Sequence, residues 1–149
     1  MSWKEDLNSA LEIRNAKDQR VAQNRHDVEE RLTARYADAA QVWLTRVVPE
    51  LEAFVEIVRK RGGEIELISN SNGKDHLGAT VTTKPAGHED VIFTVNVHVT
   101  SDGTNATFNA TEGRRSLSSE GFGQLPQLED EAFVATLLGL MTRIYSNVI

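Results

Sequence analysis

Two histidines, His76 and His98, are the residues whose type and spacing offer the most chemistry in this sequence. On neighbouring strands their imidazole rings could share a metal ion or meet an acidic partner. A stable zinc site needs three or four ligands, however, and only Glu66 or a loop carboxylate could complete this one. We therefore expect no bound metal and no cofactor, and we favour two solvated rings.

The register of the strands decides whether this histidine pair exists. An antiparallel pairing of Thr83 with Val91 sets His76 directly opposite His98. An alternative pairing puts Gly78 opposite His98 instead. The first pairing keeps the alternation in phase and brings Leu77 opposite Val97, and the predicted rows below use it, while the alternative stays open.

A row of polar residues accompanies the histidines. From Val91 to Thr111 apolar and polar residues alternate, which predicts strands with one face toward a core and the other toward solvent. The polar face is either an ordinary wet surface or a binding platform, and β propensity together with solubility favours the wet surface. As a candidate ligand or partner surface it comprises His76, His98, Asn96, Thr94, Thr107 and Asn109.

Three further candidates, Arg114, Arg115 and Phe122, lie in the Ser/Gly-rich segment from Gly113 to Asp130. The lack of periodicity in this segment predicts a hinge or connector loop. It has the flexibility of an anion-binding loop but lacks the GK[ST] of a P-loop, which disfavours phosphate binding. Phe122 either packs against the core or, if it is exposed, serves as a recognition handle.

No other group of residues points to catalysis. The chain contains no cysteine, which excludes disulfides, thiol nucleophiles and cysteine-ligated metals. Titratable residues gather at His88–Asp90, Glu29-Glu30 and Glu129-Asp130, but wet loops and the first turns of helices collect such residues without any chemistry. The sequence therefore favours a non-enzymatic protein over an enzyme.

Composition narrows the possible partners. The chain has 16 Lys and Arg against 22 Asp and Glu, and this acidic balance, a net charge of −6, disfavours general binding to a nucleic-acid backbone. The N-terminus has no apolar signal region, and no run approaches the roughly 18 apolar residues of a membrane span. We expect a cytoplasmic protein without a nucleic-acid or membrane partner.

Periodicity divides the 149 residues into three parts, which predicts an α+β fold in a single domain. The capping-box spacing of Ser2 with Glu5, and of Asp27 with Glu30, predicts two helix starts. The polar stretch between these starts is either a solvated helix face or a break. We expect a semi-independent helical arm over 1–26, a long helix over 27–61, an antiparallel sheet over 64–112 and a C-terminal helix over 127–147.

The long helix carries one apolar stripe, whose members recur every three or four residues. Pro49 lies inside the stripe and removes a backbone donor, which predicts a kink near Arg46. The segment Arg59–Gly63 supplies the basic residues and the glycine that end a helix. The stripe comprises Val28, Leu32, Tyr36, Ala39, Trp43, Val47, Leu51, Phe54 and Val58.

The strand-rich middle predicts a four-stranded antiparallel meander with helices on its apolar face only. We expect a two-residue turn at Asp102-Gly103 and a three-residue loop at Ser71–Gly73. The first turn would pair Val97 with Phe108, and the second would pair Leu67 with Leu77. The resulting outer rows are His76, His98, Thr107 and Gly78, Asn96, Asn109.

Two functional hypotheses remain. In the first, the protein is a non-enzymatic interaction module of the adaptor or chaperone kind, which self-associates through its N-terminal helices and can bind another protein. A helix over 27–61 would be about 50 Å long against about 20 Å for a short strand, so part of its apolar stripe needs another partner. In the second, a ligand-binding protein or enzyme holds a cavity between sheet and helices, where small alanines leave room. That cavity would be lined by Leu67, Val97, Phe108 and Trp43, beside Ala79, Ala106 and Ala110.

Overall fold

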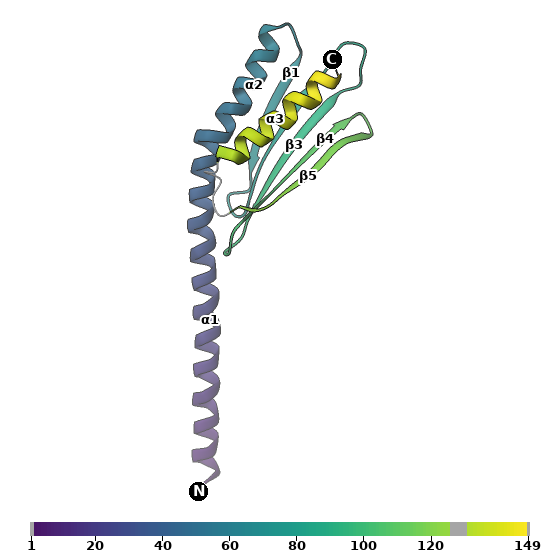
Figure 1. The fold of residues 1–149 in the computed structure, drawn as a ribbon. Helices are drawn as coiled ribbons and strands as arrows, with labels where there is room; N and C mark the ends of the chain where they lie inside the picture. The colour runs from purple at the N-terminus through teal and green to yellow at the C-terminus, as the bar shows by residue number, and fades with distance from the viewer. Residues whose placement is uncertain (1, 126–130, 149) are drawn as a thin grey trace.

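The computed structural model describes residues 2–125 and 131–148, which form a long helical region, an antiparallel sheet and a C-terminal helix (Figure 1). This architecture confirms the α+β prediction. The helices are α1 (Trp3–Val42), the π-helical turn η1 (Trp43–Val47), α2 (Val48–Lys60) and α3 (Glu131–Val148), and the strands are β1 (Ile65–Ser71), β2 (His76–Thr83), β3 (Val91–Val99), β4 (Thr104–Glu112) and β5 (Arg115–Leu125).

The first helix is continuous from Trp3 to Val42, so the polar stretch in its middle is a solvated helix and not a break. The second predicted helix start was therefore wrong. The Asp27 carboxylate accepts a hydrogen bond from the Gln23 side chain at 3.1 Å instead of capping a helix. Ser2 does precede the first turn, but its side chain makes no capping hydrogen bond. The predicted boundary between residues 26 and 27 is therefore absent, because α1 runs through it.

The kink expected near Arg46 is present as the π-helical turn Trp43–Val47. There the N–H of Val48 donates to the carbonyl of Trp43, five residues back. This wider turn directly precedes Pro49, which occupies the first turn of α2, where its missing N–H is not needed. From this point α2 leans away from the axis of α1 (Figure 1).

The sheet has five antiparallel strands in the order β1-β2-β3-β4-β5, one more than predicted. The additional strand, β5, is the segment that we expected to be a loop. Two register irregularities in its pairing with β4, between Asn105 and Thr107 and between Ala110 and Thr111, interrupt the alternation by which a strand is recognised. As an edge strand, β5 also tolerates the Ser and Gly residues that made it resemble a loop.

The central hairpin has the predicted register, because Thr83 pairs with Val91 and His76 with His98. The β1–β2 pairing is shifted: Leu67 lies opposite Val81 and not Leu77. The cause is a longer turn, in which Oδ1 of Asn72 accepts hydrogen bonds from three successive N–H groups. The donors are Lys74 at 2.8 Å, Asp75 at 2.9 Å and His76 at 2.9 Å.

The β3–β4 pairing also differs from the prediction, with Val97 opposite Ala106 and not Phe108. Here the hydroxyl of Thr100 accepts from the N–H of Gly103 at 3.1 Å, which extends the turn beyond the two residues expected. Both shifts move the pairing by an even number of residues. The apolar set therefore still faces the core, as it must in any register of that parity.

The core lies between the apolar face of the sheet and the helices α2 and α3, which lie over that face (Figure 1). The ring of Phe54 on α2 packs edge to face against Phe93 of β3 and Tyr145 of α3, with ring centroids 6.2 Å and 6.1 Å apart. These contacts join the sheet to both helices. Trp43 is 1% exposed and donates from Nε1 to the Ser69 hydroxyl at 3.4 Å. Its burial confirms the predicted helical phase.

The C-terminal helix covers most of the predicted range and ends at Val148. Its expected residues Phe133, Leu137, Met141 and Ile144 are buried. The predicted helix start before Glu131, with the acidic pair Glu129-Asp130, lies outside the described residues. The other acidic pair, Glu29-Glu30, lies in the middle of α1 and not in a first helical turn, so the helix dipole does not explain it.

Candidate functional site

The main feature without a partner in the described chain is the N-terminal part of α1. We call residues 3–31 the arm and the rest of the described chain the body. Every residue of the arm is exposed, and the arm extends well beyond the sheet (Figure 1). At 1.5 Å per residue it is about 45 Å long. The junction lies near Tyr36, whose hydroxyl accepts from the N–H of Gly73 at 3.1 Å and donates to the carbonyl of His76 at 3.4 Å.

The apolar residues of the arm continue the stripe that is buried in the body. At about 100° per residue, nearly all of them fall within about 60° of the direction of Trp43. Ile13, in contrast, points about 120° away from that direction. These side chains are between 41% and 69% exposed. This arm stripe comprises Trp3, Leu7, Leu11, Val21 and Val28.

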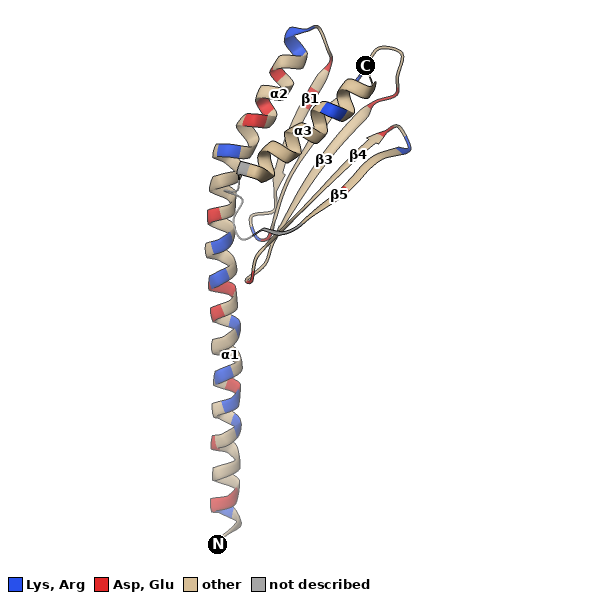
Figure 2. Ribbon diagram, viewed as in Figure 1, with Lys and Arg blue, Asp and Glu red and all other residues tan. Residues whose placement is uncertain are grey.

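Charged residues occupy the gaps in the arm stripe. Arg14, Asp18 and Arg25 lie on the same side of the helix as the apolar members, within about 20° of Trp43. In the part of the chain that the structure describes, none of the three makes an ion pair. Figure 2 shows charges of both signs along the whole of α1.

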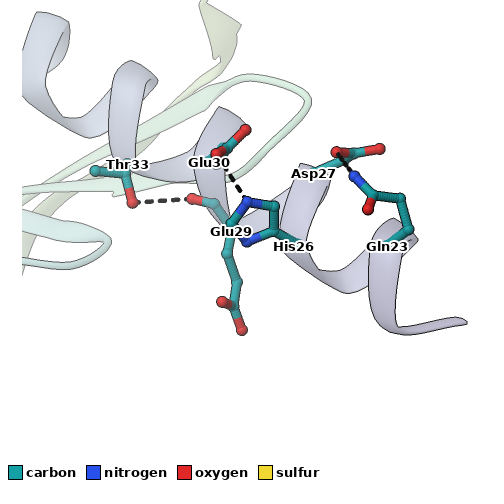
Figure 3. Close-up of polar contacts among 6 residues, drawn as sticks. All are labelled: Gln23, His26, Asp27, Glu29, Glu30 and Thr33. Carbon is teal, nitrogen blue, oxygen red and sulfur yellow. Dashed lines mark hydrogen bonds and ion pairs between the residues drawn. The ribbon is translucent and has the colours of Figure 1, made fainter. Parts of the chain in front are cut away.

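One polar contact of the arm lies on this stripe, with the Lys4 ammonium at 5.8 Å from the centroid of the Trp3 ring, whereas the side-chain pairs of the arm lie away from it. His26 Nε2 contacts Glu30 Oε1 at 2.9 Å, and Gln23 pairs with Asp27, each one helical turn apart (Figure 3). By the same geometry these four side chains point at least about 100° away from Trp43. Pairs at this spacing stabilise a solvated helix face by a few tenths of a kcal/mol. The arm therefore has one solvated face with internal pairs and one apolar face without a partner.

The stripe predicted from the sequence begins at Val28 and so does not include the rest of the arm stripe. A signal was present, because Val21 lies seven residues before Val28, and Leu7 and Leu11 lie four residues apart, on the same helical face. The charged residues Arg14 and Asp18 interrupt it and made the segment look uniformly polar.

The histidine pair exists on the open face of the sheet, where His76 lies opposite His98. His76 is half-buried and His98 exposed. Polar side chains converge over the neighbouring Gly78: a Cβ atom there would lie 2.8 Å from Oδ1 of Asn70 and 3.1 Å from Nε2 of His76. Within residues 2–125 and 131–148, no three His, Asp or Glu side chains are placed to hold a metal ion.

The other candidates on this face are arranged differently from the predicted rows. Because the β3–β4 turn is longer, Asn96 lies opposite Thr107 and not Asn109, and Thr94 lies opposite Asn109. His98 lies opposite Asn105. All of these residues remain on the open face, so the structure brings them together as one polar surface without forming an enclosed site.

The three candidates near the fifth strand are separated. Phe122 is half-buried and contacts Phe133 of α3 edge to face at 5.0 Å, so it packs against the core and is not a free handle. Arg114 is exposed in the Gly113-Arg114 turn between β4 and β5. Arg115 begins β5 and lines a cleft.

That cleft of about 520 Å³ lies at one end of the interface between the sheet and α3. His88 Nδ1 contacts Glu112 Oε1 there at 3.2 Å, and Arg115 lines the same cleft. The sequence offered no signal for this pair, since it depends on the pairing of Val91 with Glu112 and on the fifth strand. The lining residues are His88, Glu112, Arg115, Leu117, Ile144, Asn147 and Val148.

The place where the sequence suggested a cavity, between the sheet and the helices, is occupied by the buried core. Trp43, Val97 and Phe108 are each at most 1% exposed and belong to one buried cluster, and Leu67 packs against it. The cleft with His88 is thus a different place from the one that the alanines suggested.

No protein-family model, curated protein or solved structure matches this chain. Among the described helices, none combines the length and the apolar character that crossing a membrane requires. The function must therefore be inferred from the arm, the open sheet face and the cleft.

Proposed function

We propose that the protein is a non-enzymatic interaction module that self-associates through its arm. The observation that carries this proposal is the arm stripe, which continues the buried stripe of the body but has no covering surface within the described chain. The same helical face is 1% exposed at Trp43 and 69% exposed at Trp3.

The stability of the arm as a helix favours a partner. Most of the stability of a helix in a protein comes from packing its apolar face, because intrinsic propensity alone makes isolated helices marginal. A helix that is polar on all sides can remain solvated, but the arm carries five large apolar residues on one side. Packing that side against another helix would remove it from water and stabilise the arm.

A second copy of this chain is the occupant that fits the charges. The arm stripe contains both signs, with Arg14 and Arg25 on either side of Asp18. A partner that carries the same stripe can therefore place a carboxylate against a guanidinium and apolar residues against apolar residues. Complementary charge of this kind favours one partner over others.

The test is the mass of the full-length chain in solution, measured by light scattering at micromolar concentration. We expect an oligomer for the natural sequence and a monomer for Leu7→Glu combined with Leu11→Glu, because two charges then lie in the interface. The matched control is Ile13→Glu, which changes an equally exposed residue outside the stripe and should leave the oligomer intact. A natural chain that stays monomeric at all accessible concentrations would overturn the proposal.

A second candidate function is binding of a small anionic ligand in the cleft. It is favoured by the combination of a 520 Å³ volume with the Arg115 guanidinium and the His88–Glu112 pair. Clefts of this size that hold a few convergent polar groups are common small-molecule sites. We would titrate inorganic phosphate and succinate and follow the ring signals of His88 by NMR. Binding should be lost in Arg115→Gln and kept in the neighbouring Arg114→Gln; equal shifts in both variants would remove this candidate.

A further inference from the structure

We infer that two arms pair antiparallel, with Arg14 of each copy facing Asp18 of the other. This inference rests on the proposed self-association and adds its orientation and register. It follows from the positions of the charged residues within the arm stripe and from the length of arm that is free.

The stripe consists of two sets of positions, each repeating every seven residues, as in a coiled coil. One set contains Lys4, Leu11, Asp18 and Arg25, and the other contains Leu7, Arg14, Val21 and Val28. In an antiparallel pair of helices, a residue of one set faces a residue of the other set in the partner. Only certain registers satisfy this condition. Between neighbouring ones, each residue faces a position seven residues further along the partner, so the two-fold axis moves by half a heptad.

One register places the two-fold axis at residue 16. Arg14 then faces Asp18 of the second copy, and by symmetry the same ion pair forms twice. On either side Leu11 faces Val21, so two apolar layers flank the charges and limit their contact with water. Leu7 faces Arg25, whose aliphatic stem can cover the leucine while its guanidinium reaches solvent.

The neighbouring registers are worse. Moving the axis by half a heptad toward the body places Arg14 opposite Arg25 and leaves Asp18 opposite Val21. Moving it the other way places Asp18 opposite Leu7. Each of these leaves the short Asp18 carboxylate against an apolar side chain with no guanidinium opposite it, and the first also sets two arginines together, which costs free energy.

A parallel pair in register is also disfavoured. There every stripe residue would face itself, so that Arg14, Asp18 and Arg25 would each meet a like charge. Like charges in facing positions are repulsive and act against that orientation.

The free length of the arm agrees with the register at residue 16. In this register Trp3 faces Glu29 of the partner. Glu29 lies two residues before Arg31, where the uninterrupted run of exposed residues ends. Beyond that point Leu32 and Tyr36 are half-buried against the body. Pairing therefore uses nearly the whole arm and places the two bodies at opposite ends, where they do not compete with it for the stripe.

Charge reversal in the full-length chain tests this register. Arg14→Glu alone and Asp18→Arg alone should each create two like-charge contacts per dimer and weaken its Kd at least about tenfold. The two substitutions combined should restore the natural Kd, and an equimolar mixture of the two single variants should form a heterodimer. The control Arg20→Glu reverses a charge about 140° from the stripe and should change the Kd less than about twofold.

Cysteine cross-linking tests the orientation, because the chain has no cysteine of its own. A mixture of Leu11→Cys and Val21→Cys should oxidise to a disulfide-linked heterodimer, whereas Leu11→Cys alone should link poorly. Efficient linking of Leu11→Cys to itself would indicate parallel arms and overturn the inference. A natural chain that dimerises but is indifferent to both charge reversals would also overturn it while leaving the proposed self-association intact, whereas a monomeric natural chain would remove both.

Discussion

Trp3 and Trp43 lie on the same face of one helical region, yet the first is 69% exposed and the second 1%. The region from Trp3 to Lys60 is about 85 Å long, whereas the nine residues of β3 span about 30 Å. The sheet can therefore cover only part of the stripe. The arm and the body differ in two ways: the arm has no opposing surface in the described chain, and its stripe is interrupted by Arg14, Asp18 and Arg25.

This difference limits what an apolar stripe can mean. Periodicity of three or four residues shows that a helix face is suited to burial, but it does not show whether the covering surface belongs to the same chain. For residues Ala39 to Val58 the sheet and α3 supply that surface. For the arm we propose that a second arm supplies it.

The largest expected effect comes from truncating the two tryptophans. Trp43→Ala should lower the free energy of unfolding by about 3–5 kcal/mol, because it empties a fully buried site in the core. Trp3→Ala should change the unfolding of the body by less than about 0.5 kcal/mol, since no part of the body contacts it. Urea unfolding in dilute solution, followed by far-ultraviolet circular dichroism, measures both. A large cost for Trp3→Ala under those conditions would mean that the arm packs against its own body.

The next effect separates the two regions by concentration. If arms pair, raising the concentration of the free, unpaired chain to about 100 times the Kd should stabilise the helical arm by about 2.7 kcal/mol through mass action. Hydrogen exchange of backbone amides between Leu7 and Val28 should then slow with concentration, while amides of β3 should not respond. Exchange in the arm that is independent of concentration would contradict pairing, and equal slowing of β3 would point to contacts through the body.

How much the sequence predicted depends on how local the determining interactions are. The phase of the stripe through Trp43 follows from periodicity, which the segment carries by itself. Parity gave the face on which His76 and His98 lie, and of the two registers that share this parity the structure has the one that pairs them. The predicted registers of the β1–β2 and β3–β4 hairpins were wrong, because single side chains, Asn72 and Thr100, organise longer turns than expected. Turn lengths of this kind depend on hydrogen bonds that are not visible in an alternating pattern.

The fifth strand and the cleft were missed for a related reason. Register irregularities remove the alternation of β5, so its identity as a strand depends on the edge that β4 offers. The His88–Glu112 contact depends in turn on that end of the sheet, and it joins residues 24 apart in the chain. A site assembled from a loop, two strands and a helix end has no spacing by which one sequence could reveal it.

The smallest expected effect comes from substituting two glycines of the body by alanine. One glycine lies in the turn before the fifth strand, which the sequence did not predict, and the other lies in the C-terminal helix, which it did predict. Gly113 has a φ of 57° in the β4–β5 turn, and Gly139 lies exposed inside the predicted helix α3. Gly113→Ala should destabilise the body by at least about 1–2 kcal/mol, because the left-handed conformation is unfavourable for alanine and its Cβ would displace the Glu89 carboxylate.

Gly139→Ala should instead stabilise it by up to about 1 kcal/mol, since alanine is the better helix former and an added Cβ meets no atom within 4 Å. Urea unfolding of both variants gives the two signs directly. A neutral or stabilising Gly113→Ala would mean that this turn does not hold its positive φ in solution, and the fifth strand would then be the first part of the fold to reconsider. Neither substitution lies near the arm, so the oligomer measured by light scattering should be unchanged in both.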